Sequence, residues 1–142
     1  MPAEHSGPAP AQEHRDAKEA RRRGAAADGG TLPDERARAV VSVALGLAED
    51  FGAPCAVVLL DPDGDLQLAE RSGRLPGRRA AAAIDAGRAA LAGLDATAVG
   101  PETAAVVLRD DDGLRGALGL SGGADGFALE ACRHAARALG LE

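Results

Sequence analysis

The clearest pattern in the chain is an apolar stripe at helical spacing that follows residue 34. Its members recur every three or four positions: Ala37, Val40, Val41, Ala44, Leu47, Ala48 and Phe51. This period places them all on one face of an α-helix. Thr31, with Asp34 three residues later, has the spacing of a capping box, and Gly52 and Pro54 end the pattern. The sequence therefore predicts a helix that is capped by Thr31 and buries one face.

Two later stretches show the same period. Residues 78–94 are rich in alanine, and the positions predicted to share one face are Ala80, Ile84, Gly87, Leu91 and Leu94. A third stripe near the end of the chain contains Phe127, Ala131, His134, Ala135, Ala138 and Leu139. Both patterns predict amphipathic helices.

Four short apolar runs lie between these helices, at residues 55–60, 66–70, 103–109 and 114–120. The first pair is joined by the turn sequence DPDGD and the second pair by DDDG. Proline presets φ and glycine accepts a positive φ, so each joint predicts a hairpin turn. Residues 95–102 are expected to form a connection.

The predicted order of elements is α-β-β-α-β-β-α. Two hairpins build an antiparallel sheet, and three helices must cover it to bury their apolar faces. We therefore predict a single α+β domain over residues 31–142, with a profilin-like or GAF-like arrangement. Residues 1–30 contain no Val, Ile, Leu or Phe. They cannot bury enough apolar surface to offset their ordering entropy, so we expect a disordered tail.

Charge and composition narrow the expected partners. The formal net charge is −6, and the chain has two Phe and neither Trp nor Tyr. Nucleic acid binding is not expected, because it requires a basic face or stacking aromatics. No apolar segment approaches the ~20 residues of a membrane span. Cys55 and Cys132 lie in apolar patterns rather than in a paired motif, which is typical of reduced, buried thiols in a cytoplasmic protein.

Two short motifs resemble catalytic or metal-binding signatures. The sequence GLSGG at 119–123 matches the Gly-x-Ser-x-Gly nucleophile elbow, but a hydrolase needs an acid and a histidine after the serine, and His134 is the only downstream histidine. The DPDGD turn begins like a calcium loop, but its sixth and twelfth positions are Leu66 and Ser72 instead of Gly and Glu. No set of nucleophile, base or metal ligands is complete, so we expect a binding protein rather than an enzyme.

The most informative charges are four arginines, Arg71, Arg74, Arg78 and Arg79, in one loop and the first turn of the second helix. Guanidinium groups near a helix N-terminus favour carboxylates or phosphates. The alternative is a solvated loop whose arginines pair with surrounding acids. His134, close to the apolar face of the last helix, has two interpretations: a packed or partly exposed side chain, or an axial ligand for haem iron.

Two blocks of the sequence resemble the GlcG/HbpS-like haem-binding family. The first combines VVLLDPDG (57–64), AERSG (69–73) and AGRAA (86–90), and the second, GALGLSG (116–122), is similar to the family's GAxGVSG signature. The resemblance implies an α+β fold, haem or another small anionic molecule as ligand, and a tendency to form homo-oligomers.

The same resemblance suggests where a ligand would bind. We expect a pocket between the 71–79 loop and the 121–123 turn, with Arg71, Arg74, Arg78, Ser121, Gly122, Gly123 and His134 as candidate cofactor-binding residues. The alternative function is a GAF-like or roadblock-like regulatory or interaction module without catalytic activity.

Overall fold

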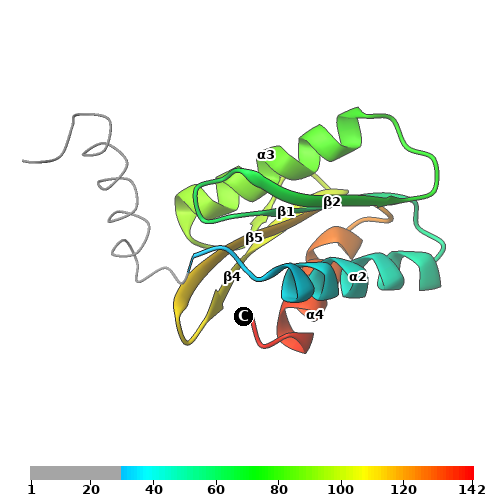
Figure 1. The fold of residues 1–142 in the computed structure, drawn as a ribbon. Helices are drawn as coiled ribbons and strands as arrows, with labels where there is room; N and C mark the ends of the chain where they lie inside the picture. Colours follow the sequence, from blue (N-terminus) through cyan, green and yellow to red (C-terminus); the bar gives the residue numbers. More distant parts are fainter. Residues whose placement is uncertain (1–29) are drawn as a thin grey trace, which may run out of the picture.

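The computed structural model describes residues 30–142 (Figure 1). The predicted tail therefore lies outside the described residues, except for Gly30. The elements follow the order α2 (Asp34–Asp50), β1 (Cys55–Leu60), β2 (Leu66–Ser72), α3 (Arg78–Gly93), β3 (Thr97–Ala98), β4 (Thr103–Asp110), β5 (Gly113–Gly122) and α4 (Phe127–Ala138). The predicted α+β class is confirmed.

The five strands form one sheet in the order β2-β1-β5-β4-β3, with antiparallel pairs throughout. The two predicted hairpins, β1–β2 and β4–β5, are joined side by side through β1 and β5. The predicted connection at 95–102 also contains the short strand β3, which pairs with β4. A two-residue strand leaves no periodicity, so the sequence could not reveal it.

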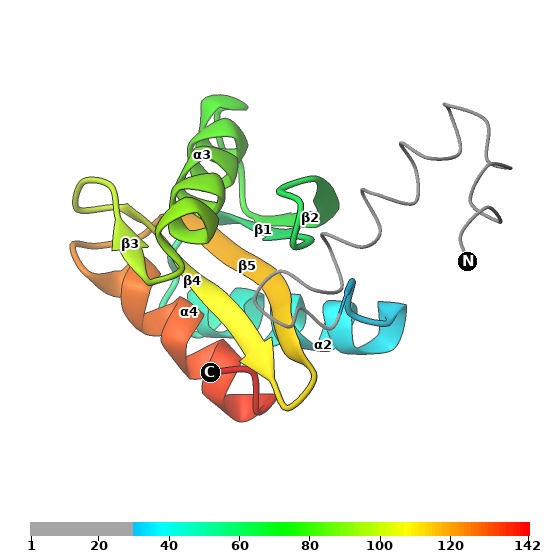
Figure 2. The ribbon, with the colours of Figure 1, turned by 90° about the vertical axis from the view of Figure 1, so that its left-hand side faces the viewer.

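The helices cover the sheet on both faces (Figure 2). α2 and α4 pack on one face, over a core that includes Val57, Leu59, Leu118 and Leu120. α3 packs on the other face, over β1, β4 and β5, and leaves β2 largely uncovered. Successive side chains of a strand point to opposite faces of the sheet, so neighbouring residues of β1 and β5 pack against opposite helix layers.

The buried face of α3 differs from the predicted stripe. The helix buries Ala83, Ala86, Gly87 and Ala90, whereas Leu94 is an exposed left-handed C-cap. Gly119 of β5 explains the difference, because a Cβ there would meet the carbonyl oxygen of Ala83. α3 lies so close to the sheet that only small residues fit between them, and its larger side chains lie at the edges of the contact.

Two predicted termini were wrong. The N-cap of α2 is Pro33, without a side-chain cap hydrogen bond, rather than Thr31. Ser121 and Gly122 belong to β5 rather than to a turn, because β5 continues its pairing with β1 and β4 to these residues. The glycine turn that leads to α4 therefore begins at Gly123.

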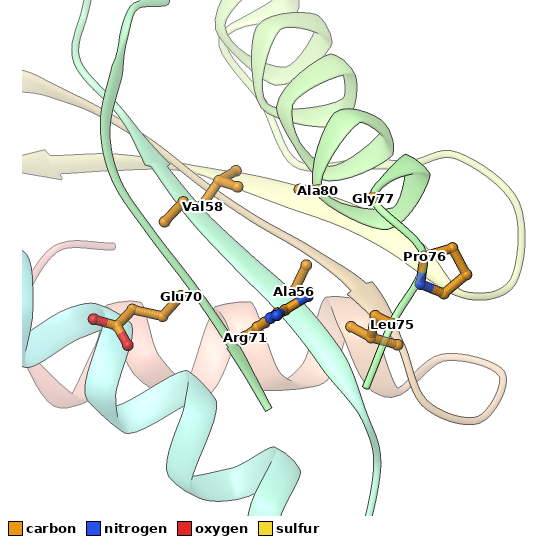
Figure 3. Close-up of a pocket in the computed structure, with 9 residues that line it drawn as sticks. Ala56, Val58, Glu70, Arg71, Leu75, Pro76, Gly77 and Ala80 are labelled. Atoms are coloured by element: carbon orange, nitrogen blue, oxygen red, sulfur yellow. The ribbon is translucent and has the colours of Figure 1, made fainter. Parts of the chain in front are cut away.

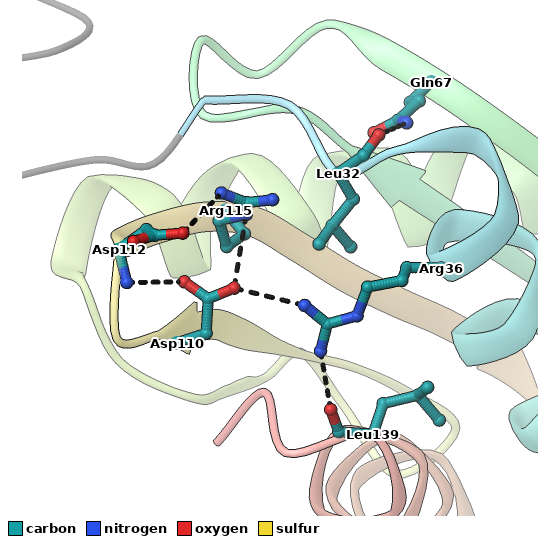
Figure 4. Close-up of polar contacts among 7 residues, drawn as sticks. All are labelled: Leu32, Arg36, Gln67, Asp110, Asp112, Arg115 and Leu139. Carbon is teal, nitrogen blue, oxygen red and sulfur yellow. Dashed lines mark hydrogen bonds and ion pairs between the residues drawn. The ribbon is translucent and has the colours of Figure 1, made fainter.

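A polar clasp holds the β4–β5 hairpin against the rest of the molecule (Figure 4). Asp110 Oδ2 lies 3.3 Å from Arg36 Nη1 and 3.5 Å from Arg115 Nε. Arg36 also donates to the carbonyl oxygen of Leu139 at 2.7 Å. The clasp thus ties together the hairpin, α2 and the end of α4. Within residues 30–142, no helix has both the length and the apolar character needed to cross a membrane.

Candidate functional site

The loop between β2 and α3 separates two grooves. We call the first the Phe51 groove; it has a volume of about 520 Å³, and its lining includes Phe51, Pro54, Arg74, Leu75, Gly122 and Gly123. We call the second the Arg71 groove; it has a volume of about 430 Å³, and its lining includes Ala56, Val58, Ala69, Arg71, Leu75 and Ala80. Leu75 is a wall of both. Both volumes lie within the range of small-molecule sites.

The Phe51 groove lies where the end of α2 meets the end of β5. The ring of Phe51, which is 71% exposed, stands edge-on to Phe127, with 5.8 Å between centroids and an interplanar angle of 79°. Gly123 has a φ of 81°, and a Cβ there would lie 2.6 Å from Phe127 Cδ2. The two phenylalanines of the chain therefore meet at this groove, and glycine is required at position 123 for the close approach of Phe127 to the backbone.

The arginines near this groove have different partners. Arg79 Nη2 forms an ion pair with Glu102 Oε1 at 3.0 Å, and its Nη1 lies 3.5 Å from Ser121 Oγ. Arg74 forms no hydrogen bond or ion pair with any of residues 30–142. Arg79 thus matches the interpretation of arginines paired with acids, whereas the N–H donors of Arg74 have no protein acceptor among residues 30–142.

Ser121 is placed as a structural residue. Its side chain is fully buried, and its hydroxyl lies 2.8 Å from Thr103 Oγ1, with either oxygen as the donor. A buried hydroxyl already engaged by a threonine is not presented to a substrate. The geometry gives no support to the nucleophile interpretation of the 119–123 motif.

The remaining candidates lie apart from one another. Arg71 lines the other groove, and Arg78 is exposed at the start of α3 and lines neither. His134 is exposed on α4, the helix on the opposite face of the sheet from α3. The structure therefore brings together only Arg74, Gly122 and Gly123 of the predicted set, and His134 stays a prediction.

Sequence reasoning missed Phe51 as a groove residue. Its place at the end of the apolar stripe predicted a core position, but it is the C-cap of α2, and its ring reaches solvent. The following Gly52 could have indicated this, because glycine often follows the end of a helix. A residue at the helix end is no longer held on the buried face.

The two thiols are buried and unpaired with each other, as expected. Burial raises the pKa of Cys55 to about 11, with a further contribution from the Glu49 carboxylate. Burial also raises the pKa of Cys132. Both sulfurs are therefore protonated near neutral pH, and neither supplies a thiolate ligand or nucleophile.

The DPDGD segment forms a hairpin turn, as predicted. Asp61 Oδ1 accepts hydrogen bonds from the backbone N–H groups of Asp63 at 2.9 Å and Asp65 at 3.0 Å. Carboxylate oxygens of all three aspartates lie within 4.8 Å of one another. Exposed carboxylates at a hairpin tip are common, and Asp61 is engaged in stabilising the turn.

Comparison with solved structures identifies the architecture. A crystal structure of a PduOC–haem complex superposes with a TM-score of 0.70, over 79% of this chain and 97% of that one, at 18% identity. The Klebsiella pneumoniae protein ORFY, of family DUF336, gives 0.59 over 76% and 87%, at 14% identity. A double mutant of Streptomyces reticuli HbpS gives 0.58 over 78% and 85%, at 14% identity. The chain has the HbpS-like fold.

The HbpS-like fold confirms the architecture that the two sequence blocks indicated. No protein-family model matches the chain, and no curated protein matches it either. At these identities the HbpS-like fold is shared, while the ligand of this chain depends on its own groove residues.

Proposed function

We propose that this chain is a small ligand-binding protein of the GlcG/HbpS type, whose Phe51 groove binds haem or another flat, apolar anion. One observation carries the proposal: the groove combines an exposed aromatic ring with the guanidinium group of Arg74, which has no partner among residues 30–142. The similar PduOC was crystallised with haem, which supports the same ligand class here.

Each groove residue has a distinct role in this proposal. Phe51 offers a ring face for stacking, and Arg74 binds a carboxylate through two N–H donors. The backbone of Gly122 and Gly123 forms part of the groove wall beside these two side chains. These residues fit the apolar ring and the carboxylates of a porphyrin.

The groove fits the iron of haem less well than it fits the porphyrin ring and its carboxylates. Among residues 30–142, its lining contains no imidazole or thiol, and the one carboxylate there, that of Glu102, is paired with Arg79. Binding is therefore proposed to depend on the porphyrin ring and its carboxylates. His134 as an axial ligand is a separate hypothesis, which the variant His134→Ala tests by the position of the Soret band.

The experiment is a titration of the purified protein with haemin and with iron-free protoporphyrin IX, followed by absorbance and fluorescence. We expect saturable binding of both, weakened about tenfold or more by Arg74→Glu, since hydrogen bonds to charged groups contribute about 1.5–3 kcal/mol. Phe51→Ala should also weaken the binding of both porphyrins.

Arg38→Glu is the matched control, because Arg38 is exposed on α2 and lies outside both grooves. It changes the net charge by the same amount as Arg74→Glu and should leave affinity unchanged. Equal effects of the two variants, or no binding of either porphyrin, would refute the proposal.

The alternative proposal is a GAF-like or roadblock-like regulatory or interaction module without catalytic activity, and with either function we propose a homo-oligomer in the cytoplasm. The edge strand β2 favours it, because within the described sheet β2 pairs with β1 alone and one backbone edge faces outward. Light scattering after size exclusion tests this. A stable dimer that binds neither porphyrin would favour the module, and a monomer would contradict the proposed homo-oligomer.

A further inference from the structure

The Arg71 groove is a second concave site, and it arises from the way α3 covers the sheet. α3 packs on β1, β4 and β5, so the same face of β2 is left without a helical cover. Two of the β1 residues that face this layer, Ala56 and Val58, form the floor of the groove. They are themselves buried, although the groove beside them is open to solvent.

The register of the β1–β2 hairpin decides which side chains line this groove. Val58 pairs with Ala69, and Ala56 pairs with Arg71, so these four side chains lie on one face. Glu70 pairs with Val57, whose side chain belongs to the opposite core. Figure 3 shows Arg71 beside Ala56, with the carboxylate of Glu70 on the other side of the β2 ribbon.

The charge of this groove is therefore one-sided. Arg71 forms no hydrogen bond or ion pair with any of residues 30–142. Leu75, Pro76 and Ala80 give the groove apolar walls. Glu70 also borders it, but its carboxylate lies on the side of the β2 ribbon away from Arg71 (Figure 3). A site with apolar walls and a single cation at its rim favours a molecule with one negative group and an apolar body.

From this geometry we infer that the Arg71 groove is a separate binding site for a small monocarboxylate with an aliphatic or aromatic body. The carboxylate is bound by the guanidinium group of Arg71, and the body lies over Ala56 and Val58 against Leu75. This inference is independent of the Phe51 groove, because the two grooves have different cations, and only Leu75 lines both.

Sodium octanoate is the probe, and its binding to the full-length protein is followed by two-dimensional amide NMR. We expect saturable shifts that are largest at Val58, Ala69 and Arg71. Octan-1-ol, which has a similar apolar body without the charge, should bind at least about tenfold more weakly, as expected for the loss of a charge-assisted contact. Arg71→Gln should weaken the binding of octanoate by the same factor and leave the binding of octan-1-ol unchanged.

A second variant tests the apolar part of the site. Ala69 is exposed on an edge strand, so Ala69→Leu adds apolar volume to the groove without entering the core. It should abolish octanoate binding. Arg38→Gln on α2 is the matched control for the loss of one positive charge, and it should have no effect.

The inference is overturned if octan-1-ol binds as tightly as octanoate, if Arg71→Gln and Arg38→Gln behave alike, or if the shifts centre on Phe51 and Gly123. Arg74→Glu separates the two sites. It should weaken porphyrin binding alone, whereas Arg71→Gln should weaken octanoate binding alone, so either site can fail without the other.

Discussion

Replacing Gly119 with alanine should test how closely α3 is held against the sheet. The φ of Gly119 lies outside the left-handed region, so the backbone itself accepts alanine. The added Cβ would, however, meet the carbonyl oxygen of Ala83, and Val58 Cγ2 lies 3.3 Å away. A backbone carbonyl of a helix cannot rotate aside, so α3 has to move away from β5.

The cost of that movement follows from the alanine contacts. α3 buries Ala83, Ala86 and Ala90 against the sheet, and each loses close packing when the helix moves outward. Insertion of extra volume into a well-packed core costs about 1–3 kcal/mol, and we expect the upper half of that range for a clash with backbone. In a domain of this size, the melting temperature should fall on the order of 10 °C.

Thermal and urea denaturation, followed by far-ultraviolet circular dichroism, measures this effect. Gly46→Ala is the matched control, since Gly46 lies inside α2 and a Cβ there would meet nothing within 4 Å. That variant should stabilise the protein by up to about 1 kcal/mol through helix propensity. If the free energy of unfolding of Gly119→Ala lies within about 0.5 kcal/mol of that of the unmodified protein, α3 does not pack as closely on β5 as described.

Two further predictions concern groups buried by the tertiary structure. Asp110→Ala should lower the free energy of unfolding by about 2–4 kcal/mol in urea denaturation, because it removes a carboxylate that pairs with both Arg36 and Arg115, and the Arg115 side chain is only 9% exposed. A change no larger than that of Asp111→Ala, at an exposed position of the same hairpin, would contradict this. Cys55 and Cys132 should resist a thiol reagent at pH 8 in the native state and react in denaturant. Folding raises the pKa of Cys55 from 9.0 to about 11. As the pH rises, the thiol therefore loses its proton first in the unfolded state, and the free energy of unfolding should fall between about pH 9 and 11. A free energy of unfolding that stays constant over this window would show that Cys55 is solvated.

The sequence identified most elements because their local signals and their tertiary environment agree. The run at 55–60 is continuous and apolar, and β1 is buried on both faces. The DPDGD and DDDG turns predicted both hairpins, since proline, aspartate and glycine impose turn geometry regardless of the surroundings. The α2 stripe was right over most of its length for the same reason: a single solvent-exposed face enforces the period.

The candidate site was predicted less well, because proximity in sequence is a poor guide to shared side-chain direction. Arg71 and Arg74 are three residues apart, yet they line different grooves on either side of Leu75. Arg79 pairs with Glu102, which lies far along the chain. His134 was grouped with these residues by resemblance, but it lies on α4, across the sheet from α3.

The sequence by itself determined the order of the three helices and the four longer strands, the two hairpins and the burial of both thiols, since these depend on periodicity and turn chemistry within short stretches. Only the tertiary structure decided that β1 pairs with β5, that an alanine face of α3 meets Gly119, and that two grooves flank one loop. Those features depend on how closely distant segments approach, which is set by the packing of whole layers rather than by any local pattern.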